Sequence, residues 1–164
     1  MKSNWEERNA IVANLFNPAF CGEVIRTVAF SYNKHSDTKF PFVFAFISLP
    51  ILLHERTRSQ MPRSIRTYFF VWVEKNDSLF FDFPKRTRGM VQFTKEAIMF
   101  LLAHEKIRLT DEGGIDTDGV RPKKSITPDA DEYNDIIKKA EMLGKWLAIT
   151  SEPRSIFSFF RITP

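Results

Sequence analysis

The chain has 164 residues, a formal net charge of +4 and a composition that is 43% hydrophobic. These values are typical of one globular domain with a sizeable core, so we treat residues 1–164 as a single domain. A single cysteine, Cys21, excludes an intrachain disulfide and is typical of a reducing compartment, so we expect a cytoplasmic protein.

The first clear helix is predicted to begin at Asn17 and Pro18, after a lead-in of some helical character at 1–16. Asparagine is a favoured N-cap and proline suits the first helical turn. Apolar residues then recur with a helical period to about Tyr32, and the polar residues 33–39 indicate a loop.

The longest apolar stretch runs from Phe40 to Leu53, carries no charge and contains one polar side chain, Ser48. We interpret it as a central helix, buried on all sides, that Pro50 kinks or restarts. A pair of buried strands is the alternative, because phenylalanine, valine and isoleucine also favour strands. The stretch is shorter than the roughly 20 residues that span a bilayer, so we expect no membrane segment.

The middle of the chain predicts further short elements. Ser64 is placed to cap an amphipathic helix that reaches Val73, and Thr94 is placed to cap another helix. Alternating residues and turn chemistry predict a β-hairpin near 106–117. Around 80–117, a short helix, a capped helix and a hairpin would therefore follow one another, which is the order of a winged helix.

Two helices are predicted near the end of the chain. Thr127 and Pro128 mark the start of the last long helix, and Pro153 opens a short final segment. The predicted fold class is therefore mainly α with a small β component (α+β), in a compact helical domain.

Residues with catalytic chemistry do not form a recognisable group. The three histidines lack metal-ligand spacing, and Cys21 falls within an apolar helical pattern that suits a buried thiol. We therefore expect a protein that is not an enzyme and that uses no cofactor and no metal.

Basic residues form two groups, one after the apolar stretch and one after Pro84, and Lys95 lies further along. We take them as candidate contacts to a protein partner or to DNA, while a solvated face with ordinary surface pairs is the alternative interpretation. The candidate contacts are His54, Arg56, Arg58, Arg63, Arg66, Lys85, Arg86 and Arg88. The seventeen phenylalanines exceed what a small core commonly needs, so we also propose an apolar interface, while a role in the core is the alternative interpretation, and the favoured one for most of them. Its candidates are Phe157, Phe159 and Phe160.

Several short motifs occur in a characteristic order along nearly the whole chain. They are NPAF at 17–20, LPILLH at 49–54, TR at 57–58, MPRSIRT at 61–67, FP at 83–84, FTKEAIMFLL at 93–102, KKAEMLGKWLA at 138–148 and IFSFFRITP at 156–164. In this order and total length, the chain resembles the middle component of bacterial three-component ABC (ABC-3C) systems. These systems include the Lamassu type of antiphage and anti-plasmid defence.

The resemblance implies a non-catalytic adaptor that works beside an SMC-like coiled-coil ABC ATPase and an effector, often a nuclease. The complex would restrain the effector until foreign DNA is sensed, and DNA contact would be indirect, through the complex. A winged-helix DNA-binding regulator is the alternative, but the predicted helix at 94–105 is close to neutral rather than basic. A stand-alone enzyme would need paired acids or an activated nucleophile, which we do not find.

Overall fold

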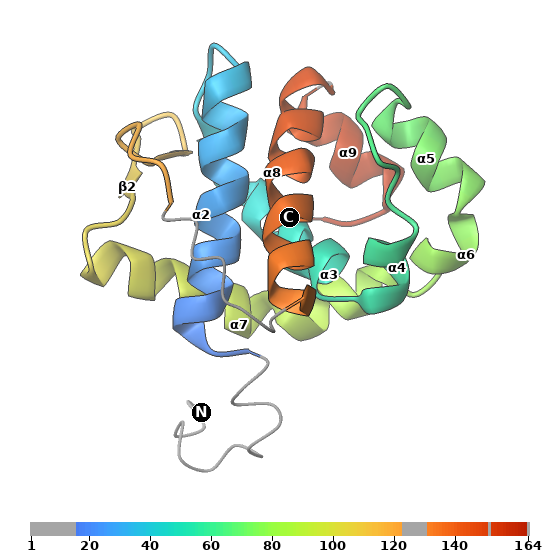
Figure 1. The fold of residues 1–164 in the computed structure, drawn as a ribbon, viewed down its shortest axis with the longest axis horizontal. Coiled ribbons are helices and arrows are strands. Elements are labelled where there is room, and N and C mark those ends of the chain that lie inside the picture. Colours follow the sequence, from blue (N-terminus) through green and yellow to red (C-terminus); the bar gives the residue numbers. More distant parts are fainter. Residues whose placement is uncertain (1–15, 123–130, 151, 164) are drawn as a thin grey trace.

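The structure, a computed structural model, describes residues 16–122, 131–150 and 152–163. Two long helices, α2 (Pro18–His35) and α8 (Asp131–Ile149), lie side by side, and the long helix α7 (Phe83–Ala103) crosses below both (Figure 1). The contact between α2 and α8 is the most extensive contact between two elements among the described residues. The predicted class, mainly α with a small β component, is confirmed.

Helix α2 begins where the sequence predicts. The Asn17 side-chain oxygen accepts a hydrogen bond from the Ala19 backbone N–H at 2.8 Å, and Pro18 occupies the first turn. The helix continues to His35, slightly beyond the predicted end, and buries the apolar face from Cys21 to Tyr32.

The central apolar stretch divides into three elements rather than one. It consists of strand β1 (Phe40–Pro41), the 3₁₀-helix η2 (Phe42–Phe44) and helix α3 (Ala45–Leu52). The prediction of a central buried helix is confirmed for 45–52 and wrong for 40–44. The reason is long-range pairing, because Phe40 pairs with Ile115 and its N–H donates to the Asn33 side chain at 2.7 Å.

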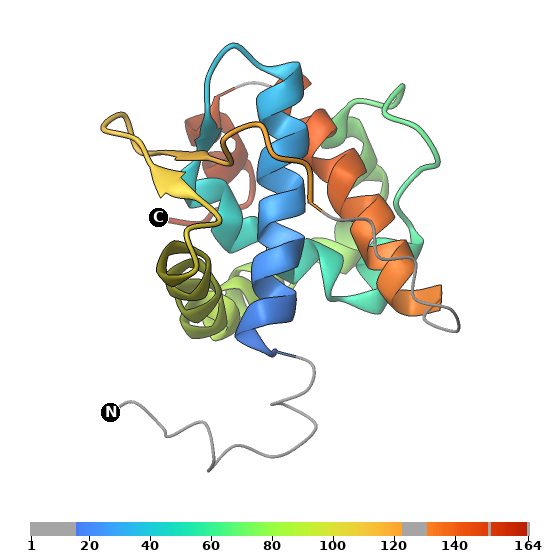
Figure 2. The same ribbon diagram turned by 60° about the vertical axis from the view of Figure 1, so that its left-hand side comes forward.

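The small sheet lies at one side of α2 (Figure 2). Strands β2 (Arg108–Leu109) and β3 (Gly114–Asp116) form the predicted hairpin, whose turn includes Gly113 with a φ of +78°. Strand β1 adds to the other edge of β3, which gives an antiparallel sheet of order β1-β3-β2. A segment from the first half of the chain therefore completes the three-stranded sheet.

Two predicted helix starts are wrong. Helix α5 (Phe69–Lys75) begins after Ser64, and the residues from 64 to 68 are outside any helix. Helix α7 begins at Phe83 and includes Thr94, whose hydroxyl donates to the Met90 carbonyl at 3.0 Å instead of capping. Gly89 is the only glycine between Pro84 and Thr94, and one glycine does not end a helix that is packed against a core.

The remaining elements are short. Helix α4 (Glu55–Ser59) follows the central helix, α6 (Asp77–Phe80) follows α5, and α9 (Pro153–Phe159) is the predicted final segment. The order of short helix, helix and hairpin is thus present as α6, α7, β2 and β3, with a longer second helix than predicted. The predicted start of α8 at Thr127 lies outside the described residues.

Aromatic rings fill the core between α5, α7, α8 and α9. Phe69 meets Trp146 edge-on with ring centroids 5.3 Å apart, and Phe83 meets Phe160 at 4.5 Å. Edge-on and tilted pairs of this kind stabilise a core beyond the burial of their area. Most of the phenylalanines therefore have an internal role.

Candidate partner-binding surface

The basic corner, as we call residues 54–66 after the apolar stretch, begins with an N-cap made by histidine. His54 Nδ1 lies 3.3 Å from the Thr57 N–H, which donates to it, and 2.7 Å from the Thr57 hydroxyl. Burial, and then the positive charge of Arg86, lower the pKa of His54 below its ordinary value. A neutral imidazole can accept the cap hydrogen bond, so the local environment favours the state that stabilises α4.

Arg58 points inward instead of toward solvent. It is only 4% exposed and donates to the Leu52 carbonyl at 2.8 Å, to Glu132 at 2.9 Å and to Asp135 at 2.9 Å. The planar guanidinium thus joins the end of α3 to the first turns of α8. Arg58 stabilises the fold, and in this structure its side chain is not offered to a partner.

Arg86 has a similar internal role. Its guanidinium donates to Asp82 at 3.2 Å, to the Thr57 hydroxyl at 3.3 Å and to the Leu79 carbonyl at 3.4 and 3.5 Å. Burial lowers the pKa of Arg86, with Asp82 opposing the effect. Arg86 therefore ties the first turn of α7 to α4.

The other basic candidates lie at the surface. They are exposed and form no ion pair with another described residue. The exposed set is Arg56, Arg63, Arg66, Lys85 and Arg88. The eight candidates named from sequence therefore separate into the capping histidine His54, two arginines that hold the fold together and five side chains that face solvent.

The C-terminal phenylalanines separate in the same way. Phe157 and Phe160 are 4% and 5% exposed and belong to the hydrophobic core. Phe159 is 37% exposed and packs against Phe70, with ring centroids 4.8 Å apart. Of these three phenylalanines, Phe159 is therefore the one that reaches the surface.

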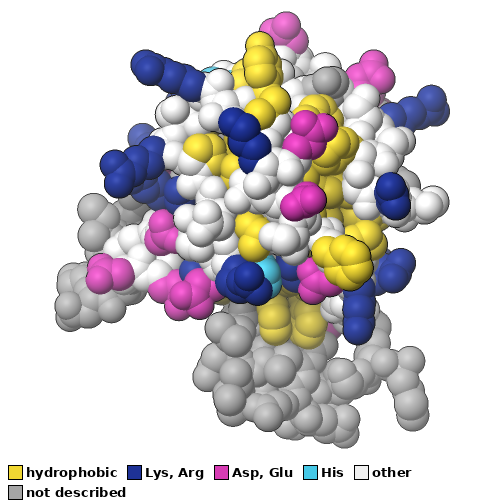
Figure 3. All heavy atoms as spheres, turned by 90° about the vertical axis from the view of Figure 1, so that its right-hand side faces the viewer, with side chains coloured by type: hydrophobic (Ala, Val, Ile, Leu, Met, Phe, Trp, Pro, Cys, Tyr) yellow, Lys and Arg dark blue, Asp and Glu magenta, His cyan; other side chains and the backbone are white. Residues whose placement is uncertain are grey.

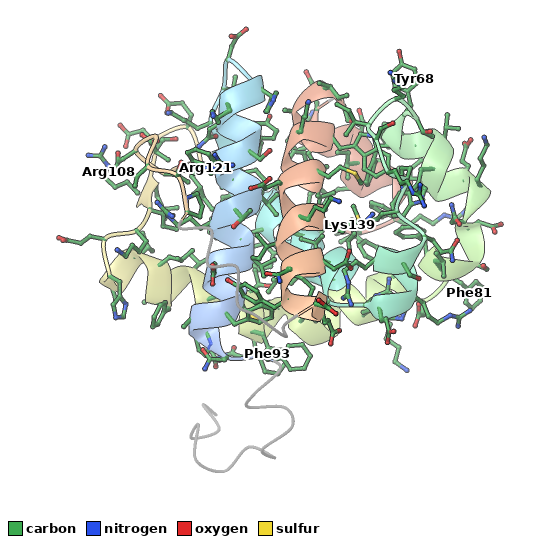
Figure 4. All side chains as sticks on the ribbon, in the orientation of Figure 1. Tyr68, Phe81, Phe93, Arg108, Arg121 and Lys139 are labelled. Carbon is green, nitrogen blue, oxygen red and sulfur yellow. The ribbon has the colours of Figure 1, made fainter. Side chains whose placement is uncertain are left out.

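Among the described residues, the most exposed aromatic side chains are not candidates named from sequence. Phe81 is 93% exposed and Tyr68 is 74% exposed, and both lie on the side of the molecule that carries α5 and α6 (Figure 4). A signal for Phe81 was available, because four of the five residues from Leu79 to Phe83 are large and apolar. One helical face cannot bury four such neighbours, so at least one of them must point outward.

A groove of about 330 Å³ lies beside Phe81. Its apolar walls come from α5, α6, the first turn of α7 and α9, and Glu74, Asp77 and Arg161 also line it. The apolar lining is Val73, Phe80, Phe81, Pro84, Phe159 and Phe160. Figure 3 shows this side of the molecule, where hydrophobic side chains reach the surface between charged ones. An apolar centre with a charged rim is the arrangement found in protein–protein interfaces.

Neither a metal centre nor a membrane span is found in the part of the chain that the structure describes. Its residues contain no group of three or more histidine, cysteine, aspartate or glutamate side chains placed to hold a metal ion. None of the described helices combines the length and the apolar character that crossing a membrane requires.

Comparison with known proteins gives one finding. Residues 5–164 match the family model described as ABC-three component (ABC-3C) system Middle Component 3. No curated protein and no solved structure gives a significant match. The family match covers nearly the whole chain, including every element described above.

Proposed function

This chain belongs to the Middle Component 3 family of ABC-three component systems, and we propose that it serves there as a non-catalytic adaptor subunit. In this proposal the system is a cytoplasmic defence complex of the Lamassu type, directed against phages and plasmids. The partners are an SMC-like ABC ATPase that engages DNA and a nuclease-type effector that the complex restrains until foreign DNA is sensed.

The observation that supports the proposal is the exposed ring of Phe81 at the edge of an apolar groove. Moving a phenylalanine side chain from water into an apolar interface stabilises a complex by about 1.5–3 kcal/mol. Exposed aromatic side chains beside a pocket commonly contribute most of the binding energy of an interface. The groove around Phe81 therefore suits stable contact with another subunit.

The exposed arginines support the same role by a different physical effect. Arg56, Arg63 and Arg66 face solvent without an internal counter-charge among the described residues. Charges of this kind speed association with an acidic surface and make the rate depend on salt. They remain candidate contacts of the adaptor.

The deciding experiment is co-expression with the ATPase and the third component of the same operon, followed by affinity purification on a tag attached to this chain. We expect a stable complex with the ATPase. The Phe81→Ser variant should bind at least about tenfold more weakly, because truncating a side chain that is a hot spot of an interface costs about 2 kcal/mol or more.

Met99→Ser is the matched control. Met99 is 66% exposed near the C-terminal end of α7, whereas Phe81 lies just before the N-terminal end of that helix. The control should leave binding unchanged. Absence of any retained partner with the wild-type chain would overturn the adaptor proposal. If the Phe81 variant and the Met99 variant both bound the partner as tightly as the wild type, the groove would not be the contact.

A further inference from the structure

A second apolar pocket, also of about 330 Å³, lies apart from the Phe81 groove. Its walls come from the 3₁₀-helix η2, the start of α3, the middle of α7 and the C-terminal segment. The apolar lining is Phe42, Val43, Phe46, Val91, Phe157 and Ile162. A pocket of this volume can hold a bulky side chain.

Two cations stand at this pocket without a counter-charge. Arg88, Val91 and Lys95 follow one face of α7 at three- and four-residue spacing, and all three line the pocket. Arg88 and Lys95 are exposed and form no ion pair with another described residue. None of the described lining residues is acidic. The pocket therefore combines an apolar interior with an unbalanced positive charge.

Thr87 adds an unsatisfied polar group to the pocket wall. It is 3% exposed, and its hydroxyl oxygen has no hydrogen-bond partner among the described residues. Thr94 on the same helix is buried too, but its hydroxyl donates to the Met90 carbonyl. A buried hydroxyl without a partner lowers the stability of the fold at this wall.

We propose that this pocket binds an extended acidic segment of a partner protein that carries one bulky apolar side chain between two acidic ones. Seven residues of α-helix separate Arg88 from Lys95, which is about 10.5 Å along the helix axis. An extended chain advances about 3.3 Å per residue and places side chains i, i+2 and i+4 on one face, so acidic side chains four positions apart lie about 13 Å apart, a separation that the long, flexible side chains of Arg88 and Lys95 can meet. The apolar side chain between them enters the pocket.

This inference rests on the proposed adaptor function and adds the chemistry of one partner segment to it. The apolar walls favour a peptide over a nucleic-acid backbone. Phosphate groups would pair with Arg88 and Lys95 but would leave the phenylalanine and isoleucine walls unused. Nucleic acid is therefore kept as an outcome of the test.

The test uses the full chain and a fluorescein-labelled peptide with two glutamates four positions apart and a phenylalanine midway between them. Fluorescence anisotropy should show saturable binding that weakens as salt rises. The same peptide with serine in place of phenylalanine should bind at least about tenfold more weakly, since the apolar contact is lost.

Variants of the protein complete the test. The double variant Arg88→Gln and Lys95→Gln should lose at least about tenfold in affinity, because both charge-assisted contacts disappear. The matched double variant Lys106→Gln and Lys145→Gln removes the same charge at exposed positions outside the pocket lining and should bind like the wild type. Circular dichroism confirms that each variant is folded, which is expected because all four side chains are exposed.

Three results would overturn the proposal. They are equal binding of the phenylalanine and serine peptides, unchanged affinity in the Arg88 and Lys95 variant, and displacement of the peptide by a single-stranded oligonucleotide that itself binds more tightly. Failure here remains distinguishable from failure of the adaptor function. If co-purification succeeds but this peptide does not bind, the adaptor function is retained and this pocket is excluded as the site that binds an acidic partner segment.

Discussion

The carbonyl oxygen of Val28 lies 2.2 Å from the position that a Cβ atom on Gly144 would occupy. The Ser31 Cβ atom is 2.8 Å from the same point. Only a residue without a side chain lets α8 approach α2 this closely. The same approach brings the Ser31 hydroxyl within 2.6 Å of the Glu141 carbonyl, to which it donates.

We therefore predict that Gly144→Ala destabilises the protein. The added methyl group must push two long helices apart at their most extensive contact. Overpacking of this kind lowers the free energy of unfolding by about 1–3 kcal/mol, and the backbone contact here places the change at the upper end. Urea denaturation followed by circular dichroism measures the loss.

Gly89→Ala is the matched control for that measurement. Gly89 lies within α7, and a Cβ atom added to it would have no neighbour within 4 Å beyond its own helix. Alanine is favoured over glycine in a helix by about 0.8–1 kcal/mol, so this variant should be more stable than the wild type. Equal effects of the two substitutions would contradict the close contact between α2 and α8.

Arg58 should matter for stability far more than its exposed neighbour Arg63. Arg58→Met leaves the Leu52 carbonyl without its donor and removes both ion pairs to α8. We expect a loss of about 1–3 kcal/mol in the free energy of unfolding, since a buried acceptor is left unsatisfied. Arg63→Met should change it by less than about 0.5 kcal/mol. Thermal unfolding of the two variants compares them directly.

The different roles of these arginines change how the basic corner is tested for assembly. Reversing the charges of Arg56, Arg63 and Arg66 together should keep the isolated chain folded while weakening complex formation or defence. Including Arg58→Glu should unfold the chain, because a carboxylate would face Glu132 and Asp135. Assembly and defence that survive the triple change would identify the corner as a solvated face.

Cys21 should be unreactive in the folded protein. Burial, and then the nearby charge of Glu96, raise the pKa of its thiol to about 12, and the residue is fully buried. The nucleophilic thiolate is therefore scarce at about pH 8 and has no access to reagent. A chromogenic disulfide reagent should label Cys21 slowly in buffer and rapidly in guanidinium chloride. Equal rates in the two conditions would contradict its buried position.

His54 should make stability depend on pH. Its pKa is lower in the folded state than its ordinary value of 6.5, so the unfolded chain takes up a proton more readily. The contribution of His54 is therefore fully present above pH 6.5 and is lost as the pH falls through the lowered pKa. Urea midpoints at about pH 7.5 and about pH 5 should show the decrease.

A His54→Asn variant tests the origin of that decrease. Asparagine keeps the N-cap of α4 but does not titrate, so the variant should lose less stability on acidification than the wild type. His104→Asn, at an exposed histidine beyond the end of α7, makes the same substitution away from α4 and is the control. The cap assignment would be wrong if both variants behaved like the wild type.

The sequence by itself determined the elements whose signals are local. The cap at Asn17, the apolar period of α2 and α8, and the turn at Gly113 each depend on residues within a few positions of one another. A helical period of apolar residues indicates which face of a segment is buried. A turn residue indicates where the chain reverses direction. These elements were predicted because their physical causes lie within the segment.

Tertiary structure alone decided the features that depend on distant partners. Phe40 is part of a strand because it pairs with Ile115 of β3. The Arg58 side chain points inward because Glu132 and Asp135, in the first turns of α8, form ion pairs with it. The burial of Phe160 under Phe83 has the same origin. The neighbouring sequence does not determine whether an apolar or basic side chain packs in the core, pairs with a carboxylate or faces water. Only the packing of the helices determines which side chains remain for a partner protein.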